Sequence, residues 1–281
     1  MIRTLGIDLA SQDKNTAICS IQWTSGMAVA DVPVTNVGDD ALVTAMASAD
    51  WTGIDAPFGW PDEFVAAIHG YATANRWPEK APSKRMRFRE TDAFVHGTLA
   101  AAGKRVSPLS VSSERIAACA WRCARLLTRF SSEYRWTLDR VGVPFANGVD
   151  GPPQHRQGRL VAQRGIVEVY PAAALATWGV PYKGYKTRSA ATASEAEATR
   201  TVILDEICAG TTDWLIVEET AKRAMLDNDH ALDAFVCSLV TYAAATGETH
   251  MPDINLLGAA RREGWIHVPI SDSLHGLVRH A

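Results

Sequence analysis

The sequence lacks the short motifs that identify three large classes of enzyme. It has no G-x-x-x-x-G-K-[ST] phosphate loop, no G-x-G-x-x-G dinucleotide turn and no G-x-S-x-G nucleophile elbow. P-loop NTPases, Rossmann dehydrogenases and α/β-hydrolases position their chemistry with these loops. Their absence argues against all three classes, so an active site has to be sought in other residues.

Cysteine is sparse and scattered. The chain contains no C-x-x-C pair, and its cysteines are odd in number: Cys19, Cys119, Cys123, Cys208 and Cys237. A zinc knuckle or a disulfide framework would need a regular spacing of cysteines. The pattern therefore favours a reducing compartment and argues against a metal site built from sulfur.

Net charge and long apolar runs are limited as well. The 281 residues are 47% apolar and 21% charged, with a formal net charge of −3. This composition is typical of a soluble globular protein, and no global basic field indicates nucleic acid, so any such surface must be local. No apolar run is long enough to span a bilayer, and the N-terminal residues resemble a strand more than a signal peptide. We expect a cytoplasmic protein without a membrane partner.

The hydrophobic pattern predicts an α/β fold with a mixed sheet. Continuous or alternating apolar residues indicate three strands that follow one another, then a helix, then a short buried strand ended by Pro57. These elements are expected over residues 2–10, 16–23, 27–34, 39–50 and 51–59. Three antiparallel strands followed by parallel ones, flanked by helices, are the simplest arrangement.

The middle of the chain differs in character. Proline, arginine and tryptophan are frequent between residues 61 and 164, strands are hard to find, and a long helix is expected over 113–133. We expect a single domain over 1–281 that carries 61–164 as a mainly helical insertion and 250–281 as a C-terminal extension.

A further strand and three helices follow the insertion. The strand is expected over 164–171, and the helices over 194–209, 213–221 and 227–245. The last helix is apolar on nearly all sides, which predicts that it is covered by the rest of the domain.

Three strands each carry one carboxylate near the C-terminal end. Asp8 stands in LGIDLAS, Asp55 in TGIDAPFG and Glu168 in GIVEVYP. One such acid alone would usually face solvent or cap the next loop. If the strands are parallel neighbours, however, the acids converge outside the carboxyl ends of the sheet, where open α/β sheets bind ligands. We expect this convergence.

The helix over 227–245 opens with ionisable groups ahead of its apolar residues. Asp229 in the first turn can be explained by N-capping and the helix dipole, but it is also a candidate metal ligand. Asp233 lies one turn further in, and a carboxylate buried there needs a cation, a donor or a proton. His230 lies on the same side. It could bind a metal, move a proton or orient Asp233, although a histidine in a first turn is often just surface.

Converged carboxylates indicate a metal ion. They repel one another and raise each other's pKa unless a cation is present. Mg²⁺ or Mn²⁺ suits hard oxygen ligands, and one or two such ions could activate water and stabilise the leaving oxygen of a phosphodiester. A divalent-metal site is therefore predicted.

Local basic segments could bind phosphates. The segment 76–92 mixes cations with Trp77 and Phe88, a composition suited to phosphates and stacked bases. The candidate substrate-binding residues are Arg85, Arg87, Arg89, Lys183 and Lys186. Arg89 could instead pair with Asp92, three residues on. The long helix carries a second basic row, which is more often a solvated face: Arg115, Arg122, Arg125 and Arg129.

Several of these stretches together resemble one protein family. GIDLA, IDAPFGWP, RETD, SPLSVSSERIA, VEVYPAAAL, GYK, DHALDAF and EGWIHVP are similar to domain-of-unknown-function family 429, described as predicted nucleases with an RNase H-like fold. HALDA at 230–234 also resembles the final-helix motif of RuvC-type resolvases. The resemblance implies a metal-binding core of Asp8, Asp55 and Asp233.

The same resemblance implies additional ligands or supporting groups at Glu168 and at Asp229 or His230. In resolvase-type sites the fourth-strand acid is commonly glutamate, whereas here it is Asp55, one methylene shorter. Glu168 and Asp55 therefore compete for the middle position among the ligands.

The leading hypothesis is a metal-dependent nuclease that acts on nucleic acid or a nucleotide. Its expected catalytic residues are Asp8, Asp55, Asp233, Glu168 and His230, and its expected metal ligands are Asp8, Asp55, Asp233 and Asp229. A homodimer is possible, because resolvase-like enzymes often act as dimers.

Two alternatives stay open. One is a catalytically silent RNase H-like module that only binds a partner. The other is an actin-like or sugar-kinase-like ATP-binding protein, because GIDLAS resembles a first phosphate loop. That class also needs a second such domain and a glycine-rich nucleotide loop, which this chain does not show.

Overall fold

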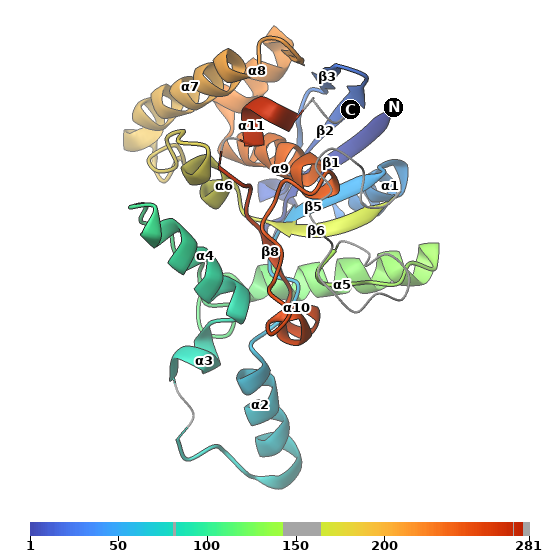
Figure 1. The fold of residues 1–281 in the computed structure, drawn as a ribbon, viewed down its shortest axis with the longest axis vertical. Coiled ribbons are helices and arrows are strands. Elements are labelled where there is room, and N and C mark those ends of the chain that lie inside the picture. The colour runs from blue at the N-terminus through green and yellow to red at the C-terminus, as the bar shows by residue number, and fades with distance from the viewer. Residues whose placement is uncertain (81–82, 143–163, 272, 278–281) are drawn as a thin grey trace.

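A mixed eight-stranded sheet forms the centre of the protein (Figure 1). The computed structural model describes residues 1–80, 83–142, 164–271 and 273–277. The strands are β1 (Ile2–Asp8), β2 (Ala17–Thr24), β3 (Met27–Ala30), β4 (Val34–Thr35), β5 (Trp51–Asp55), β6 (Gly165–Val169), β7 (Leu215–Val217) and β8 (Ile266–His267). Their order is β7-β3-β2-β1-β5-β6-β8, and β4 pairs with β2.

The pairing confirms the predicted fold class. β1, β2 and β3 pair antiparallel, whereas β1, β5, β6 and β8 follow one another in parallel. β7 adds a parallel edge beside β3. The carboxyl ends of β1, β5, β6 and β8 therefore meet at one edge of the sheet.

Helices cover both faces of this sheet. They are α1 (Asp39–Ser48), α2 (Asp62–Ala74), α3 (Ser83–Arg87), α4 (Glu90–Ala101), α5 (Ala117–Tyr134), α6 (Pro171–Thr177), α7 (Ala193–Gly210), α8 (Glu219–Asp227), α9 (Asp229–Ala245), α10 (Leu257–Glu263) and α11 (Ser273–Gly276). α9 lies across β1, β2 and β5 on one face, with α6 and α8 against it. α1 and α5 supply the core of the other face.

α9 is the most deeply buried helix of the described residues. Every residue from Ala231 to Ala245 is buried, as predicted for a helix covered on all sides. It begins at Asp229, because the side chain of Asn228 accepts a hydrogen bond from the His230 N–H and caps the first turn. Within the described ranges, no helix is both long enough and apolar enough to cross a membrane.

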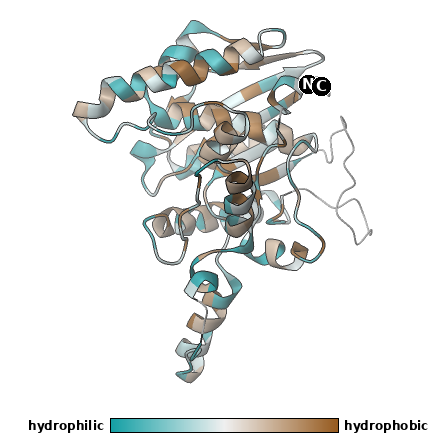
Figure 2. Ribbon diagram, turned by 60° about the vertical axis from the view of Figure 1, so that its left-hand side comes forward, coloured by the Kyte–Doolittle hydropathy of each residue, from teal (hydrophilic) through white to brown (hydrophobic). Residues whose placement is uncertain are grey.

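The described part of 61–164 contains α2 to α5 and no strand. α2 and α3 project from the body as an arm, visible at the bottom of Figures 1 and 2. α4 packs on α10 and β8, so this segment is seated on residues of the C-terminal stretch 250–281. β8 in turn extends the sheet beside β6.

Three boundaries differ from the sequence prediction. The strand expected over 27–34 is divided into β3 and β4 around Pro33, which has no N–H to donate to a ladder. The helix expected over 213–221 begins only at Glu219, because Leu215–Val217 pairs with β3 as β7. The helix expected from 113 begins at Ala117, because residues 111–116 form turns.

Candidate metal centre and the adjoining cavity

Asp8 and Asp55 end two neighbouring parallel strands. The register of β1 and β5 places them directly opposite each other. Side chains alternate along a strand, so Asp8 lies on the same face as Gly6, and Asp55 on the same face as Gly53. This is the face that α9 covers, and both carboxylates therefore lie near the first turns of that helix.

Two glycines let α9 approach closely. A Cβ atom at Gly6 would lie 2.0 Å from the carbonyl oxygen of Ala234, and one at Gly53 would lie 2.0 Å from the Thr241 Oγ1. No side chain fits between strand and helix at either position. The contact brings Asp233 to the acids, and one ligand atom from each of Asp8, Asp55 and Asp233 lies within 4.8 Å of the others. The predicted convergence of these three residues is present.

Lys186, and His230 when its ring is protonated, partly balance the charge of the acid cluster formed by Asp8, Asp55 and Asp233. His230 Nδ1 lies 2.6 Å from Asp8 Oδ2, and Lys186 Nζ lies 2.7 Å from Asp233 Oδ2. The hydrogen bond to Asp8 is the main cause of the raised pKa of His230. The charge of Asp233 is the main cause of the raised pKa of Lys186.

Asp55 has no cation of its own within the described ranges. Burial, and then the negative charge of Asp8, raise the pKa of Asp55 well above its ordinary value. Burial likewise raises the pKa of Asp233 from 3.8 to about 6. The cluster is therefore short of positive charge, which is the condition that a divalent cation relieves.

The donor set fits Mg²⁺ or Mn²⁺. The Asp233 carboxylate is fully buried: its Oδ1 accepts a hydrogen bond of 2.8 Å from the Tyr185 hydroxyl, and its Oδ2 lies 2.7 Å from Lys186 Nζ. Together with the oxygens of Asp8 and Asp55 this carboxylate forms an all-oxygen site of the kind these hard cations prefer.

Glu168 does not join the cluster, because it points to the other face of the sheet. In the pairing of β5 with β6 it lies opposite Ile54, one residue before Asp55. Its carboxylate accepts two hydrogen bonds from the Arg89 guanidinium, at 2.7 and 2.9 Å, and one from the Phe58 N–H at 3.0 Å. Burial raises the pKa of Glu168, and Arg89 opposes that rise. Glu168 thus holds the loop that follows Asp55.

Arg89 is fully occupied in the same ion-pair group. Its side chain is buried and donates to Glu168, to both carboxylate oxygens of Asp92 and to the backbone oxygen of Glu263. These bonds use all five guanidinium N–H groups, so none is left for a phosphate. The alternative offered by the sequence, a pairing of Arg89 with Asp92, is the one found.

Asp229 also lies outside the cluster. It accepts a hydrogen bond of 3.3 Å from the Thr187 N–H, next to Lys186. Arg200, which the sequence analysis did not single out, donates to the Tyr185 carbonyl and to the Thr187 hydroxyl. Asp229 and Arg200 therefore hold the loop that presents Tyr185 and Lys186 to Asp233.

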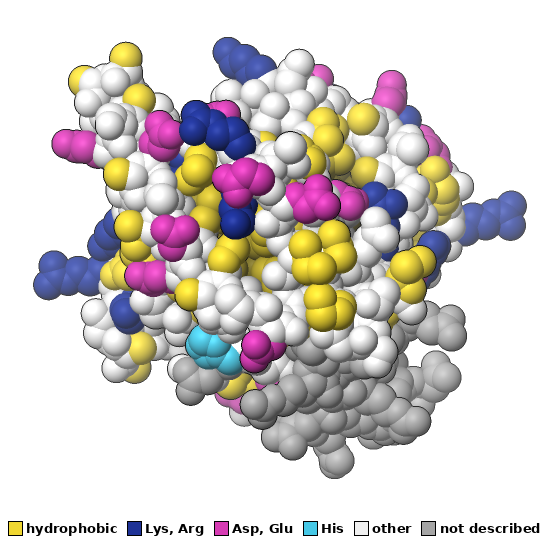
Figure 3. All heavy atoms as spheres, turned by 90° about the horizontal axis from the view of Figure 1, so that it is seen from above, with side chains coloured by type: hydrophobic (Ala, Val, Ile, Leu, Met, Phe, Trp, Pro, Cys, Tyr) yellow, Lys and Arg dark blue, Asp and Glu magenta, His cyan; other side chains and the backbone are white. Residues whose placement is uncertain are grey.

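The remaining predicted basic residues are dispersed. Arg85 pairs with Glu63 and Arg87 with Glu114, both at the surface, and Lys183 lies over the Tyr182 ring. Of the basic row on the long helix, three residues are paired with acids at the start of α1 or before it: Arg122, Arg125 and Arg129. On the face shown in Figure 3, basic side chains alternate with acidic and neutral surface.

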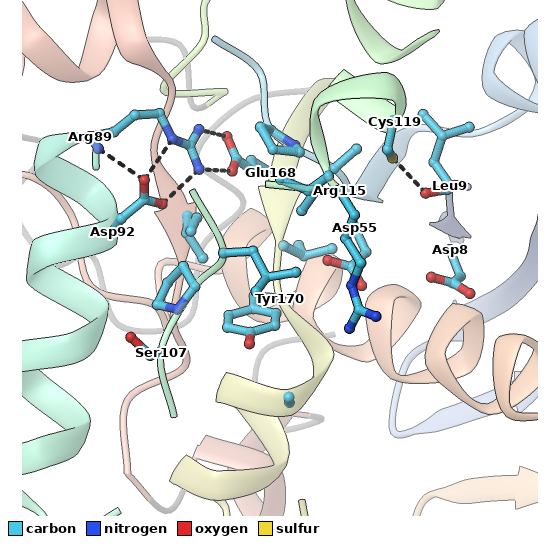
Figure 4. A pocket seen from close by; sticks show the side chains of 18 of the residues that line it. Asp8, Leu9, Asp55, Arg89, Asp92, Ser107, Arg115, Cys119, Glu168 and Tyr170 are labelled. Carbon is cyan, nitrogen blue, oxygen red and sulfur yellow. Dashed lines mark hydrogen bonds and ion pairs between the residues drawn. The ribbon is translucent and has the colours of Figure 1, made fainter. Parts of the chain in front are cut away.

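A cavity of about 420 Å³ adjoins the acid cluster (Figure 4). Asp8, Asp55 and Lys186 line one end of it. The buried group of Arg89, Asp92 and Glu168 lines another part, as the dashed bonds in Figure 4 show. A ligand in this cavity would therefore touch the carboxylates of Asp8 and Asp55.

One sequence signal was missed. The triplet Gly-Ile-Asp occurs twice, at residues 6–8 and 53–55. In each triplet the glycine allows α9 to approach the strand, and the aspartate lies beside Asp233 of that helix. The repeat would have distinguished Asp8 and Asp55 from Glu168, which is preceded by Ile-Val.

A family model confirms the resemblance drawn from the sequence. The model described as "Protein of unknown function (DUF429)" matches residues 6–255. The chain therefore belongs to the DUF429 family. No curated protein and no solved structure matches it.

Proposed function

We propose that this DUF429 protein is a metal-dependent phosphodiesterase that acts on nucleic acid or a nucleotide. The observation that carries the proposal is the acid cluster, in which three carboxylates from β1, β5 and α9 lie within 4.8 Å and lack a full complement of cations. Structural acids normally have partners, as Glu168 has, and an uncompensated group beside a cavity is characteristic of a functional site.

The ligands of the ion would be Asp8, Asp55 and Asp233. A bound Mg²⁺ or Mn²⁺ supplies positive charge for a phosphate and lowers the pKa of water. We expect one or two ions at most, because Lys186 already pairs with Asp233 and His230 with Asp8, and little negative charge is left to balance.

His230 is placed to hold and move a proton. Its Nδ1 is engaged by Asp8, which fixes the ring, and its side chain is 31% exposed. A ring held in this way can exchange a proton at Nε2 with a leaving group or a water molecule.

Lys186 is placed to meet a phosphate. Its side chain is 49% exposed and lines the cavity, while its ammonium group contacts Asp233. An ammonium at this position can neutralise an entering phosphate once the acids are balanced by a divalent ion.

The sheet topology supports the same reading. Strands β3, β2, β1, β5 and β6 follow one another in the sheet, with the first three antiparallel, and α9 crosses the sheet. An RNase H-like fold, as expected from the resemblance, would have this arrangement with acids on its first and fourth strands and on its final helix.

Hydrolysis of phosphodiesters by the purified protein tests the proposal. Single-stranded and double-stranded DNA and RNA would be incubated with Mg²⁺ or Mn²⁺, with EDTA, and with the variants Asp8→Asn and Asp55→Asn. We expect cleavage that requires the ion and falls by roughly two orders of magnitude or more in both variants.

The matched control is Asp40→Asn, which changes an exposed acid at the start of α1. It should cleave like the unchanged protein. Equal cleavage by Asp8→Asn would reject the site assignment. Absence of both cleavage and Mn²⁺ binding would instead favour a module that only binds a partner.

A further inference from the structure

The cavity beside the acid cluster has one apolar side. Pro57, Leu109, Ile116 and Tyr170 contribute to its lining, together with the methyl groups of Ala56 and Ala172. These residues come from the loop after β5, from the segment before α5 and from the end of β6. Such walls suit a flat group with apolar faces, because no charge has to be removed from water to place it there.

Polar groups are few on this side, and two of them are hydroxyls. Tyr170 points into the cavity in Figure 4, and Ser107 lies near it at the cavity edge. Burial raises the pKa of Tyr170 to about 12, so the phenol keeps its proton near neutrality and can donate it in a hydrogen bond. A ligand with both apolar faces and hydrogen-bonding edges would meet complementary groups.

Arg115 supplies a positive charge on the side of Asp55. It is exposed, lines the same cavity, and is drawn in Figure 4 with its guanidinium toward Asp55. Arg122, Arg125 and Arg129 are held by acids, but no ion pair of Arg115 is found in the described part of the chain. Arg115 and Lys186 thus present two cations at the acid-lined end of the cavity.

We infer that this cavity binds a single nucleoside unit whose phosphate lies between Arg115, Lys186 and the acid cluster. The inference deepens the proposed function and rests on it. About 420 Å³ is near the lower end of small-molecule sites, which leaves room for one nucleotide and excludes a base-paired helix. The substrate is therefore a small nucleotide or the end of a strand.

Direct binding of nucleotides tests the cavity without relying on catalysis. Thymidine 5′-monophosphate and adenosine 5′-monophosphate would be titrated separately into the full chain with Mn²⁺ present, using isothermal titration calorimetry. Ribose 5-phosphate serves as the probe without a base. We expect both nucleotides to bind and ribose 5-phosphate to bind roughly tenfold more weakly or worse.

Two variants probe opposite ends of the cavity. Leu109→Trp adds bulk to the apolar wall at a side chain that is 38% exposed, so the chain can still fold, and it should abolish nucleotide binding. Arg115→Gln should weaken binding roughly tenfold. Arg125→Gln, on the same helix but paired with Asp39, is the matched control and should bind like the unchanged protein.

Mn²⁺ affinity is measured on the same samples, and it separates the two proposals. Intact Mn²⁺ binding without nucleotide binding, or equal nucleotide binding in Leu109→Trp, would overturn the cavity inference alone. If the unchanged protein does not bind Mn²⁺, the proposed function is overturned, and the cavity inference with it.

The source of the nucleoside unit is resolved by three substrates of matched sequence. They are a circular single strand, the same strand made linear, and a dinucleotide. Cleavage of the linear strand and not the circle supports the inference and identifies a strand end, whereas cleavage of the dinucleotide alone supports it and identifies a small nucleotide. Equal cleavage rates for the circular and the linear strand would overturn the inference of a cavity for one nucleoside unit. If no substrate is cleaved, the nucleotide titrations described above decide whether the inference holds.

Discussion

Two groups of carboxylates lie near the carboxyl ends of neighbouring parallel strands, one group on each face of the sheet, and they are paired with cations differently. In the group on the α9 face, Asp55 has no cation of its own within the described residues. On the opposite face, Glu168 and Asp92 share Arg89, whose N–H donors are all engaged. Asp8, Asp92, Glu168 and Asp233 are all buried, so burial alone does not distinguish the two groups.

The comparison teaches that the two groups differ in direct ion pairing, because one guanidinium contacts both Glu168 and Asp92, whereas Asp55 has no ion pair within the described residues. Through Glu168, Asp92 and the Glu263 carbonyl oxygen, Arg89 links the loop after β5, the start of α4 and the end of α10, and its guanidinium contacts both carboxylates directly. To the contacts that α9 already makes, the acid cluster adds the links from Asp8 to His230 and from Asp233 to Tyr185 and Lys186. Its charge shortage costs stability, and binding of a cation is the gain that would explain it.

The largest expected effect comes from removing the shared cation. Arg89→Met would leave Glu168 and Asp92 buried without a cation, and we expect the free energy of unfolding to fall by about 3 to 5 kcal/mol. Urea unfolding followed by circular dichroism measures it. Arg125→Met removes an exposed ion pair and should cost at most about 1 kcal/mol, so similar losses in both variants would contradict a structural role for Arg89.

The next effect concerns the glycine that admits α9. Gly6→Ala would bring a Cβ atom to 2.0 Å from the Ala234 carbonyl oxygen, and overpacking of this kind costs about 1 to 3 kcal/mol or more. The shift of α9 should also weaken Mn²⁺ binding. Gly97→Ala is the control: a Cβ there meets nothing within 4 Å, and alanine should stabilise α4 by up to about 1 kcal/mol.

A smaller effect should appear in the pH dependence of the ion-free protein. The pKa of Asp233 rises from 3.8 to about 6 on folding, so the folded chain binds more protons than the unfolded chain between those values. Its contribution to stability therefore falls as pH rises through this window, by at most on the order of 3 kcal/mol.

The measurement is urea unfolding in EDTA between pH 4 and 7, with Asp233→Asn as the reference that lacks this titration. The unchanged protein should lose stability relative to the variant as pH rises, and saturating Mn²⁺ should reverse the trend because the ion binds ionised carboxylates. If in EDTA the unchanged protein instead gained stability relative to Asp233→Asn as pH rises, the attraction of Lys186 would outweigh the cost of burying the Asp233 charge.

The smallest expected effect is a gain in the free energy of unfolding, in contrast to the loss expected for Arg89→Met. Asp55→Asn removes the acid without a cation and should stabilise the ion-free protein by about 0.5 to 2 kcal/mol. It should also abolish the stabilisation that Mn²⁺ gives to the unchanged protein. Thermal unfolding with EDTA and with Mn²⁺ measures both, and a loss of stability in EDTA would show that Asp55 is a structural acid like Glu168.

Much of the fold could be predicted because it depends on local patterns. The periodicity of residues 2–10, 51–59 and 227–245 identified β1, β5 and α9, and the order of elements identified the mixed sheet. β7 was missed because its three residues are too short to show a period, and it is defined by pairing with β3.

The candidate site was predictable only in part, for a physical reason. Proximity to a strand end depends on position in the chain, and by this criterion Asp8, Asp55 and Glu168 are equivalent. The face that each acid occupies depends on the register between strands, which the sequence of one strand does not contain. Glu168 differs from Asp55 by one residue of register, and that residue moves it to the other side of the sheet.

Anomalous diffraction from crystals soaked in Mn²⁺ tests the central claim most directly. The account predicts a peak bounded by the carboxylates of Asp8, Asp55 and Asp233, with carboxylate oxygens about 2.0 to 2.2 Å from it. It predicts no peak at Glu168 or Asp92, whose oxygens are held by Arg89. A saturating soak that leaves the three aspartates without a peak would contradict the account.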